Sequence, residues 1–163
     1  MLGEVPLTVD GLPVAVTAEL ADSLLRALRD AGCTQVAGAC EQGECGSCSV
    51  LLDGRLVASC LVAAVVCEGA DVRTAPGVLG ADLAEALAGH GAVQCGFCTP
   101  GIVVAAEATI GAAVRAGRAL PASAVREALA GNLCRCTGYE GIVAAVVEVA
   151  AGRARAAAMG ERA

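Results

Sequence analysis

The sequence predicts an α+β fold in two parts, with strands in the first half and helices in the second. Alternating apolar residues around two Asp-Gly turns indicate hairpins in the first half, whereas helical periodicity dominates the second. Of the 163 residues, 56% are hydrophobic but only 1% aromatic, so Ala, Val and Leu must build the cores. Because small domains bury a modest fraction of their surface, something besides apolar packing is expected to stabilise this chain.

Two hairpins are predicted in the first half. In residues 5–16, apolar residues alternate with polar or small ones on both sides of Asp10-Gly11, a favoured two-residue turn. Residues 49–58 repeat this signature around Asp53-Gly54. A last strand is expected over residues 71–74.

Between the hairpins, the periodicity changes from that of a strand to that of a helix. Leu20, Leu24 and Leu28 recur every four residues and would share one helical face. Thr17 is the predicted N-cap of this helix, and Gly32 is expected to end it.

The segment TAPGVLG at residues 74–80 contains one Pro and two Gly and predicts a short linker. It divides the chain into predicted domains at residues 1–76 and 77–163. The second domain shows four helical patterns and a tail at 153–163 that is expected to fray. The predicted helices cover residues 81–88, 101–116, 122–130 and 139–151.

Composition excludes several classes of protein. A net charge of −6, with no lysine, argues against a nucleic-acid partner. The longest apolar stretches, such as 61–66 and 142–147, fall far short of the ~20 residues of a transmembrane helix. The N-terminus has neither the basic nor the apolar region of a secretory signal, so a cytoplasmic location is expected. In a reducing compartment, clustered cysteines usually indicate metal or redox chemistry.

A first set of cysteines has the spacing of a plant-type ferredoxin. Cys40, Cys45 and Cys48 follow the pattern C-x4-C-x2-C, and Cys60 comes eleven residues after Cys48. This spacing is typical of a 2Fe-2S cluster, with three thiolates from one loop and a fourth from across a hairpin. Glycines in the loop are expected to let its backbone turn N–H groups toward the sulfurs. They are Gly38, Gly43 and Gly46.

A structural zinc site is the alternative for this first set, because C-x2-C pairs are its usual sign. Zinc ligands normally come as two separated pairs. Here three cysteines crowd nine residues with glycines between them. This crowding favours iron–sulfur over zinc.

A second set combines two closely spaced cysteine pairs. Cys95 and Cys98 lie just before Pro100-Gly101 and a predicted helix, and Cys134 and Cys136 lie between two later helices. The positive end of a helix dipole would favour negatively charged sulfur ligands. Since a C-x-C pair is uncommon for zinc, these four thiolates could instead hold a second cluster.

The sequences QCGFCTPG at 94–101 and GNLCRCTGY at 131–139 closely resemble the iron–sulfur subunits of the xanthine oxidase family of molybdenum hydroxylases. The first half, with its C-x4-C-G-x-C pattern, also resembles the ferredoxin domain of that family. The resemblance thus covers nearly the whole chain. It implies an N-terminal β-grasp ferredoxin domain and a C-terminal four-helix-bundle domain, each with one 2Fe-2S cluster.

The resemblance also implies roles for particular residues. The helical-domain cluster would lie nearer the molybdenum, with Gln94 and the Cys136 sulfur contacting the pterin of its cofactor. The ferredoxin-domain cluster would lie nearer the flavin. Electrons would then run from molybdenum through both clusters to FAD. The implied ligands are Cys40, Cys45, Cys48 and Cys60 for one cluster, and Cys95, Cys98, Cys134 and Cys136 for the other.

Partners and substrate follow from the same resemblance. The chain lacks a G-x-G-x-x-G fingerprint and is too short for flavin and molybdenum domains, so other chains must supply them. The implied assembly has a large molybdenum-cofactor subunit and a medium FAD subunit, in a dimer of heterotrimers. Residues 38–45 most resemble purine-type dehydrogenases, so a xanthine-type or other N-heterocyclic substrate is expected; carbon monoxide- and aldehyde-oxidising relatives are alternatives. Residues 34–37 read TQVA where many relatives have Thr-Gly-Thr-Lys.

Several residues near these motifs have two interpretations. Cys33 and Cys67 match neither set and are expected to pack as small hydrophobes. His90, the one histidine, is expected at a helix end or in a loop; a Rieske cluster would need two histidines. Arg135 could balance cluster charge or pair with a carboxylate. Tyr139 could donate a hydrogen bond near the second set or anchor packing.

Two other functions remain open at this point. A free-standing ferredoxin would carry electrons by diffusion, but its ligand spacing is complete at Cys60 and it has no evident use for a second, helical module. A zinc-binding structural adaptor would have no redox function. Metal analysis distinguishes the adaptor from the other two.

Overall fold

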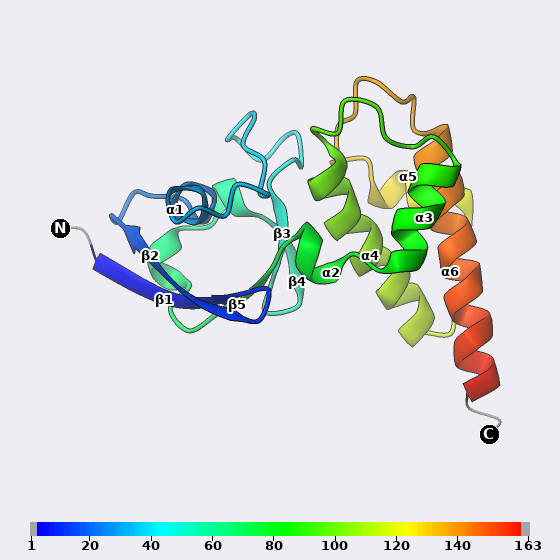
Figure 1. Cartoon of the computed structure of the whole chain (residues 1–163), viewed down its shortest axis with the longest axis horizontal. Coiled ribbons are helices and arrows are strands. Elements are labelled where there is room, and N and C mark those ends of the chain that lie inside the picture. Colours follow the sequence, from blue (N-terminus) through cyan, green and yellow to red (C-terminus); the bar gives the residue numbers. More distant parts are fainter. Residues whose placement is uncertain (1–2, 161–163) are drawn as a thin grey trace.

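The computed structural model describes residues 3–160 as a sheet-containing part beside a helical part (Figure 1). The sheet has five strands in the order β2-β1-β5-β3-β4. They are β1 (Gly3–Val9), β2 (Leu12–Ala18), β3 (Ser49–Leu52), β4 (Arg55–Ala58) and β5 (Asp71–Arg73). This confirms the predicted α+β class.

The two predicted hairpins are present. Strand β1 pairs antiparallel with β2, and β3 pairs antiparallel with β4. Strand β5 connects the hairpins because it runs parallel to β1 and antiparallel to β3. This arrangement, with helix α1 (Leu24–Asp30) across one face, is the β-grasp pattern of ferredoxins.

The predicted start of the first helix is wrong. Thr17 pairs with Glu4 in the β1–β2 hairpin, so it belongs to a strand. The helix begins later, where the Ser23 side chain caps it by accepting a hydrogen bond from the Arg26 amide at 3.3 Å. Leu20 lies before this cap and is 84% exposed. The helix ends at Asp30, close to the predicted stop at Gly32.

The sheet and α1 enclose one apolar core. Leu24 and Leu28 of α1 are fully buried against Val16 and other strand residues. Cys67 is part of this core, and Cys33 packs against it from a partly buried position. Both cysteines therefore lie where small apolar side chains are expected.

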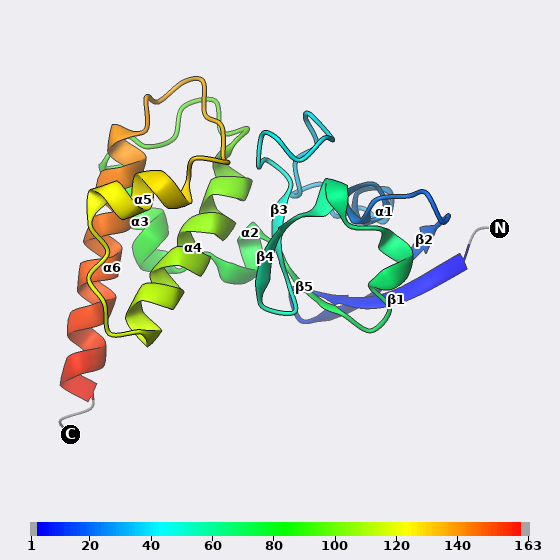
Figure 2. The same ribbon diagram turned by 180° about the vertical axis from the view of Figure 1, so that it is seen from behind.

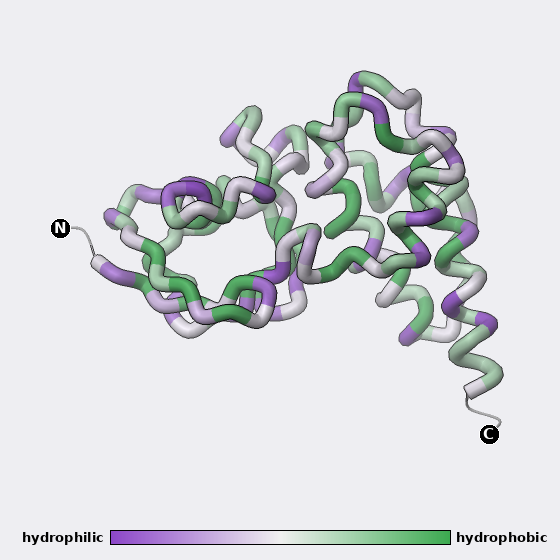
Figure 3. Tube along the Cα trace, viewed as in Figure 1, coloured by the Kyte–Doolittle hydropathy of each residue, from purple (hydrophilic) through white to green (hydrophobic). Residues whose placement is uncertain are grey.

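The second part is a four-helix bundle in which the long helix α6 contacts the other three (Figure 2). Hydrophobic residues run through α4 and much of α6 (Figure 3), and their small side chains allow close packing. Each predicted helix is present. The bundle consists of α3 (Ala81–Gly89), α4 (Thr99–Arg115), α5 (Ala122–Ala128) and α6 (Glu140–Gly160).

The predicted linker at 74–80 contains a short helix, α2 (Ala75–Val78). Pro76 lies in its first turn, where no backbone N–H is needed for a helical hydrogen bond. The Thr74 amide donates to the Asp10 carboxylate at 2.7 Å, and Thr74 is 1% exposed. This contact fixes the connection to the first hairpin turn.

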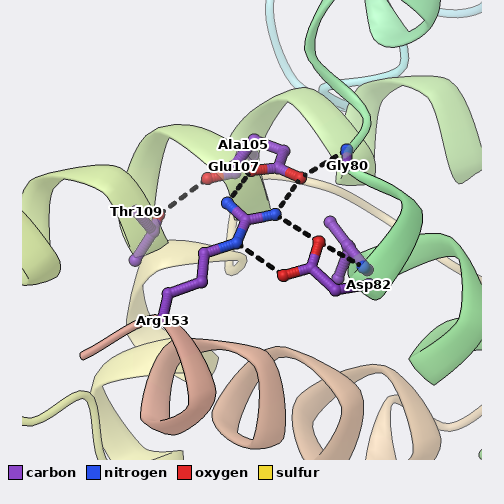
Figure 4. Close-up of polar contacts among 7 residues, drawn as sticks. Gly80, Asp82, Ala105, Glu107, Thr109 and Arg153 are labelled. Atoms are coloured by element: carbon purple, nitrogen blue, oxygen red, sulfur yellow. Dashed lines mark hydrogen bonds and ion pairs between the residues drawn. The ribbon is translucent and has the colours of Figure 1, made fainter. Parts of the chain in front are cut away.

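The expected fraying after Arg153 is also wrong, because α6 continues to Gly160; residues 161–163 lie outside the described part. Arg153 binds Asp82 at 2.7 Å and Glu107 at 2.6 Å (Figure 4). The Glu107 side chain is only 8% exposed and also accepts the Gly80 amide at 3.0 Å. These bonds raise the pKa of Arg153 and connect α3, α4 and α6.

Within residues 3–160, no helix is long and apolar enough to cross a membrane. The stretch 142–147 lies in α6 and packs its buried residues into the bundle.

Replacing Arg153 should destabilise the bundle. Arg153→Ala leaves the buried Glu107 carboxylate without its charged partner, and we expect a loss of about 2 kcal/mol in the free energy of unfolding. Asp82 contributes little to this figure because its side chain is 48% exposed. Chemical denaturation measures the loss, with the exposed Arg155→Ala of the same helix as a control. Equal stability of both variants would contradict the role of Arg153.

Candidate metal centres

The first cysteine set lies where the second hairpin meets the loop before β3. Cys40, Cys45 and Cys48 are on that loop, and Cys60 is in the short 3-10 helix η1 (Ser59–Leu61) after β4. Ser59 donates to the Cys48 carbonyl from its amide at 3.3 Å and from its hydroxyl at 2.8 Å. The hairpin register therefore brings Cys60 beside Cys48.

The four thiols of this set form two pairs. The Cys40 thiol neighbours that of Cys45, and the Cys60 thiol neighbours that of Cys48. The Gln42 amide donates to the Cys40 sulfur at 3.4 Å and, with further backbone amides, lowers the pKa of Cys40 to about 7. Burial and the neighbouring Cys48 thiol raise the pKa of Cys60 to about 11.

Two of the three loop glycines have the backbone conformation that was expected of them. Gly43 and Gly46 have φ values of 79° and 69°, a region that side chains other than hydrogen disfavour. Gly38 does not: its φ is ordinary, and a Cβ there would meet nothing closer than Leu25 at 3.6 Å. A special backbone role for Gly38 is therefore not supported.

The second cysteine set lies at one end of the helical bundle. Cys95 is in the loop before α4, and Cys98 is the N-cap residue of that helix. Cys134 and Cys136 are on the loop between α5 and α6. The Cys95 and Cys136 sulfurs are 3.5 Å apart, and the Cys98 thiol neighbours that of Cys134. This set also forms two pairs.

Each pair of the second set contains one thiol with a raised pKa and one with a lowered pKa. Burial, followed by the Cys134 thiol, raises the pKa of Cys98 to about 12. Burial alone would also raise the pKa of Cys134, but hydrogen bonds, led by that of the Thr137 hydroxyl at 3.2 Å, lower it to about 7. The Phe97 amide lowers the pKa of Cys95. These donors favour sulfur anions, the form that binds metal.

Tyr139 combines both of its expected roles. Its hydroxyl donates to the Asn132 carbonyl at 2.9 Å and accepts the Cys134 amide at 2.8 Å. Its ring packs against the core of the bundle. Tyr139 therefore orders the loop that carries Cys134.

His90, Arg135 and Gln94 lie at the end of a bundle helix or in the loops between the bundle helices. His90 caps the end of α3 as expected, and its Nε2 lies 2.7 Å from Glu148. Arg135 is exposed, and among residues 3–160 it forms no ion pair. Gln94 is exposed beside the exposed Cys95.

The two cysteine loops contact each other, a feature that the sequence did not predict. The Leu133 amide donates to the Cys45 carbonyl at 2.9 Å. The Asn132 side chain donates to the Gly46 carbonyl at 3.0 Å. We call this contact between residues 45–47, residues 131–133 and Gly101 of α4 the loop seam. No local signal in the sequence connects positions that lie so far apart along the chain.

The paired arrangement fits 2Fe-2S clusters. Such a cluster has four cysteine ligands for two irons, so each iron needs two thiolates. Both sets supply two pairs each, together with amide or hydroxyl donors to sulfur. Among residues 3–160, no three His, Cys, Asp or Glu side chains converge as they would around a single metal ion.

Both parts of the chain match known iron–sulfur families. Residues 7–77 match the family described as "2Fe-2S iron-sulfur cluster binding domain", and residues 69–147 match the "[2Fe-2S] binding domain". The two matches overlap at 69–77. This chain thus combines two 2Fe-2S domains, one ferredoxin-like and one helical.

Relatives with known names place these domains in larger enzymes. The chain is 43% identical to the xanthine dehydrogenase iron-sulfur-binding subunit of Escherichia coli O157:H7, covering 86% of this chain and 90% of the relative. It is 38% identical to an aldehyde oxidoreductase of Megalodesulfovibrio gigas, covering 89% of this chain but only 16% of that longer relative. The solved quinoline 2-oxidoreductase from Pseudomonas putida 86 superposes with a TM-score of 0.84 at 39% identity, covering 98% of each chain.

The chain therefore belongs to the iron–sulfur subunits of the xanthine oxidase family of molybdenum hydroxylases. It is an electron-transfer subunit of a molybdenum-dependent oxidoreductase. Its relatives occur both as separate small subunits and as parts of longer chains.

Serine substitutions should show which cysteine set binds which cluster. We expect Cys45→Ser to remove the electron paramagnetic resonance (EPR) signal of one reduced cluster and Cys98→Ser that of the other, because each removes one expected ligand of a different set. Cys33→Ala and Cys67→Ala should keep both signals, since these thiols pack against the first core. Iron analysis and EPR spectra of the reduced protein check this. A requirement for Cys33 or Cys67 in iron binding would show that the cysteines are divided wrongly.

Proposed function

We propose that one 2Fe-2S cluster is bound by the first cysteine set and the other by the second. The four close thiol pairs support this assignment, as do the donors aimed at Cys40 and Cys134. Each bound cluster would supply reversible one-electron chemistry. The proposed ligands are Cys40, Cys45, Cys48 and Cys60 for the first cluster, and Cys95, Cys98, Cys134 and Cys136 for the second.

The chain's own residues would hold these groups and adjust their charge. The amide of Gln42 donates a hydrogen bond to the Cys40 sulfur, and the Thr137 hydroxyl, 3.2 Å from the Cys134 sulfur, would donate to a thiolate there; both would stabilise the negative charge on sulfur. Burial of Cys48 keeps water from one side of the first set. The N-terminal end of helix α4 adds a favourable partial positive charge near Cys98, its N-cap residue.

Electrons would enter at the second set and leave from the first. The observation that carries this direction is exposure: Cys95 and Cys136 lie at the surface beside exposed Gln94, where a cofactor on another chain could approach. We propose that Gln94 and the Cys136 sulfur contact the pterin of a molybdenum cofactor there. From the first set, electrons would pass to an FAD on a further chain.

An apolar rim surrounds this exposed end. Val93 is 44% exposed, Phe97 53% and Leu133 56%, although each is hydrophobic. Exposed apolar groups that gather beside a functional site are typical of a protein interface. The rim supports burial of this end in the large molybdenum-bearing subunit, within the proposed dimer of heterotrimers that also contains a medium FAD subunit.

The proposed substrate is a purine or another N-heterocycle. One relative is named for xanthine and a solved structure for quinoline, both N-heterocycles. Aldehydes are the second candidate substrates, because one relative is named an aldehyde oxidoreductase. Carbon monoxide is the third candidate substrate. The substrate site would lie on another chain in each case.

We keep the division into domains at residues 1–76 and 77–163 as a proposal. Two apolar cores support it, one around the sheet and one in the bundle. The short helix α2 (Ala75–Val78) would then span the boundary.

Metal analysis should give about four irons and about four acid-labile sulfides per chain, with two distinguishable EPR signals after reduction. Two signals are expected because the thiol sets lie in different folds. Stoichiometric zinc, or a single cluster, would falsify the assignment of both sets.

Purification of the native complex tests the proposed partners. The chain should co-purify with a large molybdenum-containing chain and an FAD-containing chain. A chain that stays alone when produced with its candidate partners, and accepts electrons equally well from any soluble reductase, would favour a free-standing ferredoxin.

The variant Gln94→Ala should keep both clusters but slow their reduction when substrate is added to the complex. The reason is that Gln94 would contact the pterin without being a metal ligand. Rapid-mixing spectroscopy of the complex measures this rate. The exposed Gln42→Ala on the first loop is the matched control, because its side chain lies at the other set while its amide donor is retained. Equal rates for Gln94→Ala and wild type would exclude the proposed contact.

A further inference from the structure

The loop seam contains two residues that are both polar and buried, Ser47 and Asn132, and the side chain of Asn132 donates hydrogen bonds from one loop to the other. Asn132 is 6% exposed, and its Nδ2 donates to the Gly46 carbonyl at 3.0 Å and to the Ser49 hydroxyl at 3.3 Å. The next residue, Leu133, donates its amide to the Cys45 carbonyl at 2.9 Å. Asn132 therefore binds the first cysteine loop and lies two residues before Cys134 of the second set.

Glycines bring the two loops into backbone contact. A Cβ on Gly46 would overlap the Gly131 carbonyl oxygen, and a Cβ on Gly101 would overlap the Gly46 carbonyl oxygen. Gly101 lies in α4, where alanine would be the better helix former. The close approach of the first cysteine loop, rather than any requirement of the helix, thus explains why residue 101 is a glycine.

We propose that Asn132 is a positioning residue for electron transfer between the two thiol sets, because its carboxamide fixes their separation and relative orientation across the loop seam. This inference rests on the function proposed above, in which both sets hold clusters. An aliphatic residue of similar size would fill the same space but could not donate to Gly46 and Ser49. The Gly46 carbonyl would then accept only from the amide and the hydroxyl of Ser49, at 3.2 and 2.7 Å within its own loop, so its hydrogen bond across the seam would be lost.

The seam also supplies the shortest covalent and hydrogen-bonded connection that the structure shows between the sets. It runs from Cys45 through its own carbonyl to the Leu133 amide and on to Cys134. Electron transfer slows steeply as the gap between redox groups widens. A seam that opens would therefore slow transfer even when every cysteine ligand is retained.

The variant Asn132→Asp tests the inference in the iron-loaded protein. It keeps the side-chain size but replaces the donor to Gly46 with a carboxylate oxygen, which repels the carbonyl. Two reduced clusters split each other's EPR lines to an extent that depends on their distance and orientation. We expect unchanged iron and sulfide content, an altered splitting, and slower redistribution of an electron between the clusters after rapid one-electron reduction.

The variant Gly101→Ala opens the same seam by a different route. Because Gly101 is helical, alanine adds no backbone strain there, and its methyl group must push the Gly46 loop away. The matched control is Gly152→Ala in α6, where a Cβ would have no neighbour closer than 4.0 Å. We expect an altered splitting for Gly101→Ala and the wild-type splitting for Gly152→Ala.

Two results would overturn the inference. The first is wild-type splitting and wild-type redistribution in both Asn132→Asp and Gly101→Ala with iron content retained. The second is loss of iron from both variants, which would show that the seam holds the ligand loop together rather than setting the spacing. Zinc or a single cluster in the wild-type protein would instead contradict the proposed function, so the two failures are distinguishable.

Discussion

The close contact between the two cysteine loops is the constraint on which the rest of this structure depends. The backbones of the two loops and of α4 are in close contact at Gly46, Gly101 and Gly131, and the buried Asn132 side chain donates a hydrogen bond to the Gly46 carbonyl across this contact. A ferredoxin-like sheet and a helical bundle with separate apolar cores are thereby joined at the place where their functional groups lie. Without this contact, the same two cores could fold and yet leave the separation of the two cysteine sets unfixed, which would slow electron exchange between the proposed clusters.

Polar contacts away from the loops hold the same arrangement. Asp10 binds Thr74 at the connection between the parts, and Arg153 joins three helices through Asp82 and Glu107. The chain has almost no aromatic residues to fill large gaps, so its rigidity comes from close packing of small side chains and from such charged or buried hydrogen bonds. Electron transfer benefits because it requires fixed distances but no large movement.

The sequence predicted the hairpins and the four bundle helices well because their signals are local. An Asp-Gly turn between alternating apolar residues determines its own register, as at Asp53-Gly54. Errors arose where a local signal was overruled by more distant contacts. Thr17 resembles an N-cap, but pairing with Glu4 keeps it in a strand, and the end of α6 persists because Arg153 finds partners on other helices.

The cysteine sets could be identified from spacing and resemblance, whereas their pairing could not. Sequence spacing groups Cys40, Cys45 and Cys48 together but does not say which thiol faces Cys60. Only the folded hairpin brings Cys60 to Cys48. The role of Asn132 was likewise hidden, because its partners at Gly46 and Ser49 are more than 80 residues away.

Anomalous diffraction at the iron absorption edge, on crystals of the iron-loaded protein, tests the central claim most directly. The account predicts two iron atoms at each cysteine set, and each iron bonded to one pair of sulfurs. The expected pairs are Cys40 with Cys45, Cys48 with Cys60, Cys95 with Cys136, and Cys98 with Cys134. A single metal atom bonded to all four sulfurs of a set, or irons bonded across these pairs, would contradict it.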